Sequence, residues 1–238
     1  MAIPEPVAEH QHRDVQGGAV RAAVFGISDG LVSNVGLVLG VAGSNAASAF
    51  VRLAGLVSLV SGAFSMAAGE YLSMRAQTEL LEHELEMERT EIRRNPQSER
   101  QELAAIYTSR GVDPHMADEL ATEMMRDPEL ALEVHAREEL GIDPAKLGSP
   151  VGAAVSSFVA FALGALIPLF PWFLSGGAAA AVASVVLGVL GAVGIGAALG
   201  AATGRTPLRP ALRHLVVASA AAAVGYGLGT LIGGTTPV

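Results

Sequence analysis

An aspartate lies in the middle of the first long apolar segment of the chain. Asp29 is flanked there by apolar and small residues, in the run from Phe25 to Leu31. An ionisable side chain at the centre of a membrane helix costs about 2.5–3.5 kcal/mol, so it is expected to face the protein interior beside a partner. One interpretation is a carboxylate satisfied by the hydroxyls of Ser28 and Ser33. We favour the other, in which Asp29 lies on the path of an ion.

A thioether and a carboxylate follow in the second apolar segment. Met66 and Glu70 are four residues apart, which places them on the same face of a helix, one turn from each other. A thioether beside a carboxylate suits a borderline transition metal better than Mg²⁺ or Ca²⁺, which prefer oxygen ligands. Taken alone, Met66 is typical of packing and Glu70 of a membrane interface. Together with Asp29 they favour a metal pathway.

The next segment is rich in carboxylates at helical spacing. Side chains three or four residues apart share one face of a helix. The sets are Glu88 with Glu91, Glu99 with Glu102, and His135 with Glu138 and Glu139. Carboxylates that converge from several helices hold divalent cations in helical bundles. The alternative is a solvated acidic helix face, and the spacing alone favours that alternative.

Composition and charge exclude several other classes. The chain of 238 residues is 51% hydrophobic and has no cysteine, so thiolate metal sites and disulfides are excluded. Residues 76–147 hold 18 of the 23 acidic residues against 8 basic ones, a net charge of about −10 that disfavours a nucleic-acid partner. The sequence has no phosphate-binding loop, nucleophile elbow or zinc-protease signature, so no enzyme and no prosthetic group are expected.

Five apolar segments are long enough to cross about 30 Å of hydrocarbon at ~20 residues each. They are Ala19–Val41, Phe50–Met74, Val151–Phe170, Ala178–Thr203 and Ala211–Gly233. The sequence therefore predicts an all-α membrane protein of five transmembrane helices, with a helical insert between spans two and three. The predicted domains are an N-terminal tail (1–18), spans one and two (19–75), the insert (76–147) and spans three to five (148–238).

The distribution of Lys and Arg predicts the orientation. With the N-terminus and the insert in the cytoplasm and the C-terminus outside, 14 of the 15 basic residues lie on the cytoplasmic side. Arg52 is the exception. The Ala, Gly and Val-rich composition without cysteine is typical of a bacterial protein, so we expect an inner (plasma) membrane location.

Capping residues predict the helices of the insert. The second span is expected to continue to Asn95, and Asp113-Pro114 and Asp127-Pro128 are each typical of a helix start. Gly111 and Gly141 are typical of helix ends. In spans four and five, small residues recur at every fourth position, from Gly188 to Gly204 and from Gly225 to Gly233. Such ladders let helices approach closely, within one subunit or across a dimer.

These motifs resemble those of the vacuolar iron transporter family. The run from Phe25 to Leu31, the run from Ser65 to Ser73 and the acidic insert carry the resemblance, which extends from about Arg13 to Gly233. It implies a homodimer of five-span subunits that exchanges cytosolic Fe²⁺ or Mn²⁺ for protons, with a cytoplasmic domain that gathers metal.

The resemblance also implies roles for individual residues. Asp29 corresponds to the family's membrane-embedded aspartate, and Met66 corresponds to its pore methionine. The residues that match the family's metal-binding glutamates are Glu88, Glu91, Glu99, Glu102 and Glu139. For these residues the resemblance reverses the preference for a solvated acidic face.

The chain departs from the plant members at several of their functional positions. Ala22 replaces a second membrane aspartate and Ser58 replaces a pore glutamate. His135 and Ala136 stand in place of an adjacent methionine pair in the cytoplasmic site. Glu70 replaces a glycine. Our hypothesis is that Glu70 takes over part of the lost charge and that His135 replaces the soft ligand with an imidazole.

The sequence thus predicts a homodimeric exporter of Fe²⁺ or Mn²⁺ that works by proton antiport. The metal-binding residues of the insert are predicted to be Glu88, Glu91, Glu99, Glu102, His135 and Glu139, with Asp29, Met66 and Glu70 forming the transport pathway. Zn²⁺ is a further candidate for the insert. Two alternatives remain: a membrane-anchored metal buffer or sensor that moves no ion, and a transporter of a small organic solute whose insert is only a scaffold.

Overall fold

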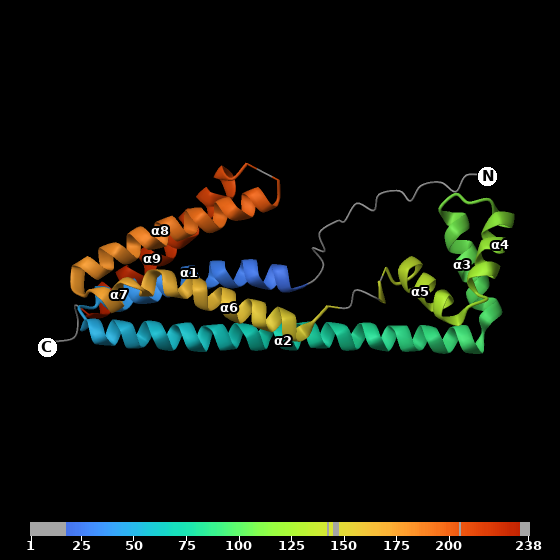
Figure 1. The fold of residues 1–238 in the computed structure, drawn as a ribbon, viewed down its shortest axis with the longest axis horizontal. Coiled ribbons are helices and arrows are strands. Elements are labelled where there is room, and N and C mark those ends of the chain that lie inside the picture. The colour runs from blue at the N-terminus through green and yellow to red at the C-terminus, as the bar shows by residue number, and fades with distance from the viewer. Residues whose placement is uncertain (1–17, 142, 145–147, 205, 234–238) are drawn as a thin grey trace, which may run out of the picture. The chain divides into compact units, whose positions relative to one another are not determined.

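All the regular secondary structure in the part of the chain that the structure describes is helical (Figure 1). The computed structural model describes residues 18–141, 143–144, 148–204 and 206–233. The predicted N-terminal tail therefore lies almost wholly outside the described residues. By their internal contacts, the described parts of 1–67 and 152–238 form one compact unit and residues 68–151 form a second.

Five helices are long and apolar enough to cross a membrane. They are α1 (Gly18–Gly43), α2 (Ser48–Arg94), α6 (Pro150–Leu169), α8 (Gly177–Ala202) and α9 (Leu208–Gly233). The prediction of an all-α membrane protein with five spans is confirmed. At 47 residues, α2 is longer than a bilayer requires, and its polar second half belongs to the second unit.

The packing within the first unit shows that the apolar helices alternate in direction. Gly36 of α1 lies against Gly225 of α9, and Gly40 lies against Gly229. The order is the same along both helices, so α1 and α9 run parallel. Helices α8 and α9 instead run antiparallel, because Gly196 approaches Ala211 whereas Gly200, further along α8, approaches Pro207. When a chain crosses a membrane five times in succession, consecutive helices run antiparallel and the first and last run parallel. The directions of α1, α8 and α9 agree with this.

The ladders of small residues pack inside the chain. A Cβ added to Gly229 would overlap the carbonyl oxygen of Gly40, and one added to Gly225 would overlap that of Gly36. Close backbone approach of this kind is what small residues allow between membrane helices. Of the two roles open from the sequence, the structure shows packing within one subunit at these positions.

Gly229→Ala is expected to lower the stability of the membrane unit by roughly 1–3 kcal/mol, because α1 must move away to admit the methyl group. Gly227 is the matched control on the same helix, since an added Cβ meets nothing there within 4 Å. Thermal unfolding of the two purified variants, followed by size-exclusion fluorescence, would measure the difference. Equal melting temperatures for Gly229→Ala and Gly227→Ala would contradict this packing.

A hydrogen-bonded core closes the connection between α6 and α8. The short helix α7 (Pro171–Leu174) lies in this connection. The indole Nε1 of Trp172 donates to Ser184 Oγ at 2.9 Å, and that hydroxyl donates to the carbonyl of Pro168 at 2.6 Å. Arg52 donates to the carbonyl of Trp172 at 3.2 Å, which gives this basic residue of the apolar segment a partner.

The second unit contains three short helices after the end of α2. They are α3 (Pro96–Ser109), α4 (Pro114–Met124) and α5 (Pro128–Glu138). The carboxylate of Asp113 accepts from the backbone N–H of His115 at 3.0 Å, and Asp127 accepts from that of Glu129 at 2.9 Å. Gly111 and Gly141 have φ of 95° and 66°, the left-handed conformation of a helix end. The predicted starts at Pro114 and Pro128 are thus confirmed, and Gly111 and Gly141 follow the ends of α3 and α5 within three residues.

Candidate metal centre

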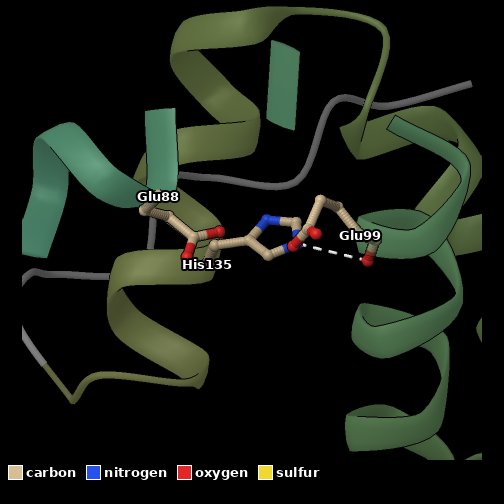
Figure 2. A group of neighbouring side chains, drawn as sticks. All are labelled: Glu88, Glu99 and His135. Carbon is tan, nitrogen blue, oxygen red and sulfur yellow. Dashed lines mark hydrogen bonds between the residues drawn. The ribbon is translucent and has the colours of Figure 1, made fainter. Parts of the chain in front are cut away.

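Two carboxylates and an imidazole from three helices meet inside the second unit. Glu88 comes from α2, Glu99 from α3 and His135 from α5, and one ligand atom of each lies within 4.8 Å of the others (Figure 2). All three residues are buried, with exposed fractions of 4%, 7% and 0%. Carboxylates are almost never buried without a partner. Their burial distinguishes this cluster from a solvated acidic helix face.

The local sequence explains why these side chains point inward. On α2, Glu88 shares a helix face with Leu85 and Ile92, which pack into an apolar cluster of the insert. On α5, His135 follows Ala131 and Leu132 of the same cluster by four and three residues. Both side chains therefore continue an apolar stripe that must be buried.

The surroundings of His135 orient its ring. Its Nδ1 lies 2.9 Å from the carbonyl oxygen of Ala131, one turn earlier on α5. When Nδ1 carries the proton and donates to that carbonyl, Nε2 presents a lone pair to the cluster. Metal-ligating histidines are typically held in this way, with the second ring nitrogen donating to a carbonyl or carboxylate. Nε2 also lies 3.3 Å from the carbonyl oxygen of Glu99, which can only accept, so this contact is a hydrogen bond when Nε2 carries the proton and is given up when Nε2 binds a metal.

Glu88 is the least satisfied member of the cluster. Among the described residues, its Oε1 is buried without a hydrogen-bond partner. Burial, reinforced by the negative charge of Glu139 and opposed by His135, raises the pKa of Glu88 to about 7. A buried carboxylate oxygen without a donor is costly, and either a proton or a cation removes that cost.

Three further glutamates lie close enough to influence the buried group. Glu91, Glu102 and Glu139 are exposed. Partial burial of the carboxylate and the charge of Glu102 raise the pKa of both Glu99 and Glu139; the charge of Glu91 adds to this rise, and His135 opposes it. The structure therefore gathers the six predicted residues of the insert into one electrostatic cluster, three buried and three at the surface. Their binding of metal stays a prediction.

Glu138, which the spacing places with His135, has a different partner. The guanidinium of Arg110 donates to the Glu138 carboxylate, and also to its backbone carbonyl at 3.1 Å. This ion pair joins the end of α5 to the residue that follows α3. Glu138 thus holds the two helices together.

Metal binding to the cluster is expected to release more protons at pH 6 than at pH 8. Carboxylates bind metal in their ionised form. With a pKa of about 7, Glu88 is mostly protonated at pH 6 and mostly ionised at pH 8. The apparent affinity should therefore rise with pH across this range, with roughly one more proton released at pH 6.

Titration calorimetry of Mn²⁺ in buffers of different ionisation enthalpy would count the protons, and Glu88→Gln should remove most of the difference. Equal proton release at pH 6 and pH 8 in the unmodified chain would contradict the prediction that Glu88 is mostly protonated at pH 6.

The predicted pathway residues have different surroundings in the membrane helices. Asp29 is half-buried on α1 and lines an open groove of about 250 Å³ together with Arg213 and His214 of α9. Met66 is half-buried on α2 and packs against an apolar cluster that contains Phe161 of α6. Asp29 thus lies beside α9 in this groove. Glu70 is half-buried on α2. The roles of all three in transport stay predictions.

Sequence reasoning missed His214, whose Nε2 lies 3.2 Å from the hydroxyl of Ser28. The available signal was an imidazole within the fifth apolar segment, one turn after Pro210. Ser28 and His214 are 186 residues apart along the chain, so their spacing does not indicate that they meet.

Apolar helices that cross in alternating directions define an all-α integral membrane protein, and its helical insert carries a buried cluster of metal-ligand side chains. Residues 20–230 match the model of the VIT family, so the chain belongs to that family. The resemblance seen in the sequence is thereby confirmed. Because the VIT family is a family of transporters, the expectation that the chain is not an enzyme is confirmed as well.

Several relatives are similar in sequence to this chain, two of them over nearly their whole length. A protein named vacuolar iron transporter 1 from Arabidopsis thaliana is 32% identical over 217 residues, which is 91% of this chain and 87% of the relative. A protein of the same name from Eucalyptus grandis is 31% identical over 92% of this chain and 89% of its own length. A vacuolar iron transporter from Acanthamoeba castellanii is 40% identical over 67% of this chain and 58% of the relative.

Proposed function

We propose that this protein moves a divalent transition-metal cation, Fe²⁺ or Mn²⁺, out of the cytoplasm in exchange for protons. The observation that carries the proposal is the buried group of Glu88, Glu99 and His135 in a five-span protein of the VIT family. Imidazole and carboxylate together suit these metals. The names of the relatives, vacuolar iron transporters, support iron as a cargo.

In this proposal the insert, residues 76–147, collects metal on the cytoplasmic side. The exposed carboxylates of Glu91, Glu102 and Glu139 attract the cation, and the buried group then holds it. The ion passes to Asp29, Met66 and Glu70 in the membrane helices. Carboxylates couple the two flows because each binds either a metal ion or a proton.

The proposed orientation has the tail (1–18) and the insert in the cytoplasm and the C-terminus outside. The distribution of Lys and Arg supports it, with 14 of the 15 on the cytoplasmic side. We propose a homodimer in an inner (plasma) membrane. The relatives are named for the vacuole, so a fluorescent C-terminal fusion imaged in the native cell would decide between the two membranes.

Metal flux into proteoliposomes with an imposed pH gradient tests the proposal. We expect uptake of Fe²⁺ and Mn²⁺ that depends on the gradient and collapses when an ionophore dissipates it. Zn²⁺ serves as the comparison ion, since the insert also has ligands that suit it. A flux unaffected by the ionophore would refute proton exchange, and the absence of any flux would refute transport.

A second candidate is a membrane-anchored metal buffer or sensor. The observation that favours it is that the buried group lies wholly within the insert unit, where it can hold metal without the membrane helices. In that case the purified chain would bind metal with the affinity of the insert, no ion would cross the bilayer, and Asp29→Ala would not reduce the tolerance of cells to excess metal.

A further inference from the structure

His214 is an imidazole held inside the membrane unit by contacts from two helices. It lies on α9 and is half-buried. Its Nδ1 is 2.9 Å from the carbonyl oxygen of Pro210, one turn earlier, and its Nε2 is 3.2 Å from the hydroxyl of Ser28 on α1. Helices α1 and α9 pack against each other from the contact of Ser28 with His214 to the close approach of Gly40 and Gly229.

The same groove contains a carboxylate. The lining residues from α1 are Phe25, Ser28, Asp29 and Val32, and those from α9 are Arg213, His214 and Val217. Within the part of the chain that the structure describes, the carboxylate of Asp29 has no hydrogen-bond or ion-pair partner. A carboxylate without a partner in a membrane helix is expected to take a cation or a proton.

We propose that His214 Nε2 and the Asp29 carboxylate form a transit site for a divalent transition metal between α1 and α9. The inference rests on the proposed transport function and adds a ligand from the last membrane helix to the pathway. Imidazole and carboxylate together suit Mn²⁺, Fe²⁺ and Zn²⁺ and give little advantage to Mg²⁺.

The hydrogen bonds of His214 prepare it to bind metal. The Pro210 carbonyl can only accept, so Nδ1 must carry a proton to form this bond, and in the neutral ring the lone pair is then on Nε2. The hydroxyl of Ser28 has a second acceptor available, the carbonyl oxygen of Val24 at 2.9 Å. A metal ion can therefore displace the hydroxyl from Nε2 without leaving a buried donor unsatisfied. A ring nitrogen on the metal with the other N–H on a carbonyl is the usual arrangement of a histidine ligand.

The charges around the groove favour weak binding. Arg213 lines the same groove, and its positive charge opposes a cation there. Helix α8, which packs on both α1 and α9, has no ionisable side chain over Gly177–Ala202. A site on a transport path must bind strongly enough to admit the ion and weakly enough to release it.

Electron spin-echo modulation of bound Mn²⁺ tests this site, because it detects the nitrogen of a coordinated imidazole. The full-length chain is purified with Glu88→Gln, Glu99→Gln and His135→Gln, which removes the insert cluster. We expect this background to retain bound Mn²⁺ with a nitrogen signal that disappears on adding His214→Gln. His115→Gln, at a histidine whose side chain is 81% exposed on α4, is the matched control and should leave the signal unchanged.

A nitrogen signal that survives His214→Gln overturns the assignment. So does the lack of any nitrogen signal in the background with His214 intact, a result that does not depend on the folding of the His214 variant. In the otherwise unmodified chain, His214→Gln should also reduce Mn²⁺ flux by roughly 10-fold or more. If the unmodified chain shows no flux but the nitrogen signal behaves as expected, the transport proposal fails and the metal site stands.

Discussion

Asp29→Asn is expected to reduce Mn²⁺ flux into proteoliposomes by about 100-fold or more, which corresponds to about 2.8 kcal/mol. Asparagine has nearly the same shape as aspartate, so the packing of α1 is preserved while the charge is removed. Without that charge, a cation that leaves the water must cross the apolar helices with no opposite charge to stabilise it. Binding of Mn²⁺ to the insert should not change, because its buried group lies in the other compact unit.

Ser33→Ala is the matched control for this experiment. Ser33 is one turn further along α1, and its hydroxyl donates to the backbone carbonyl of Asp29 at 2.6 Å, which leaves the carboxylate untouched. Its loss should change the flux by less than roughly twofold, within the usual effect of a surface hydroxyl. Unimpaired flux in Asp29→Asn would remove Asp29 from the pathway.

The second large effect is expected from His135→Gln, which should weaken Mn²⁺ binding to the insert by about 100-fold. The change removes the only nitrogen ligand of the buried group. It also leaves Glu88 and Glu99 facing each other in a buried site, where the opposing influence of His135 on their raised pKa values is lost. More of the metal-binding energy is then spent on displacing protons.

His115→Gln is again the control, since both substitutions exchange a histidine for the same amide. Competition between a fluorescent chelator and the purified full-length chain would give both affinities at pH 7. An insert affinity that is the same in His135→Gln and His115→Gln would mean that metal binds only the exposed glutamates.

The membrane spans and the insert helices were predictable from local features of the sequence. A run of about 20 apolar residues has few alternatives to a membrane helix, because every backbone polar group must be satisfied within the segment. Asp113-Pro114 and Asp127-Pro128 act on the backbone within one turn, so the starts of α4 and α5 could be predicted without knowledge of the neighbouring helices. The side chains that suit a metal, carboxylates and imidazole, could likewise be identified from the sequence alone.

The burial of each carboxylate was decided by the tertiary structure. Glu88 and Glu91 have the same chemistry and lie in the same helix, yet only Glu88 shares the face of Leu85 and Ile92 and is buried. Helical spacing shows which side chains share a face. It does not show which face a distant helix will cover, although the apolar stripe through Leu85 and Ile92 was a usable signal.

The sequence by itself determined the number of spans, the helix boundaries and the donors available for metal. Only the tertiary structure decided that Glu88, Glu99 and His135 converge and that Asp29 lies in a groove with His214. The physical reason is the range of the forces involved. Hydrophobic length and capping act within one segment, whereas a metal site needs side chains from segments that are far apart along the chain. Their meeting depends on the packing of whole helices, such as the close approach of Gly229 to Gly40 that brings α9 against α1.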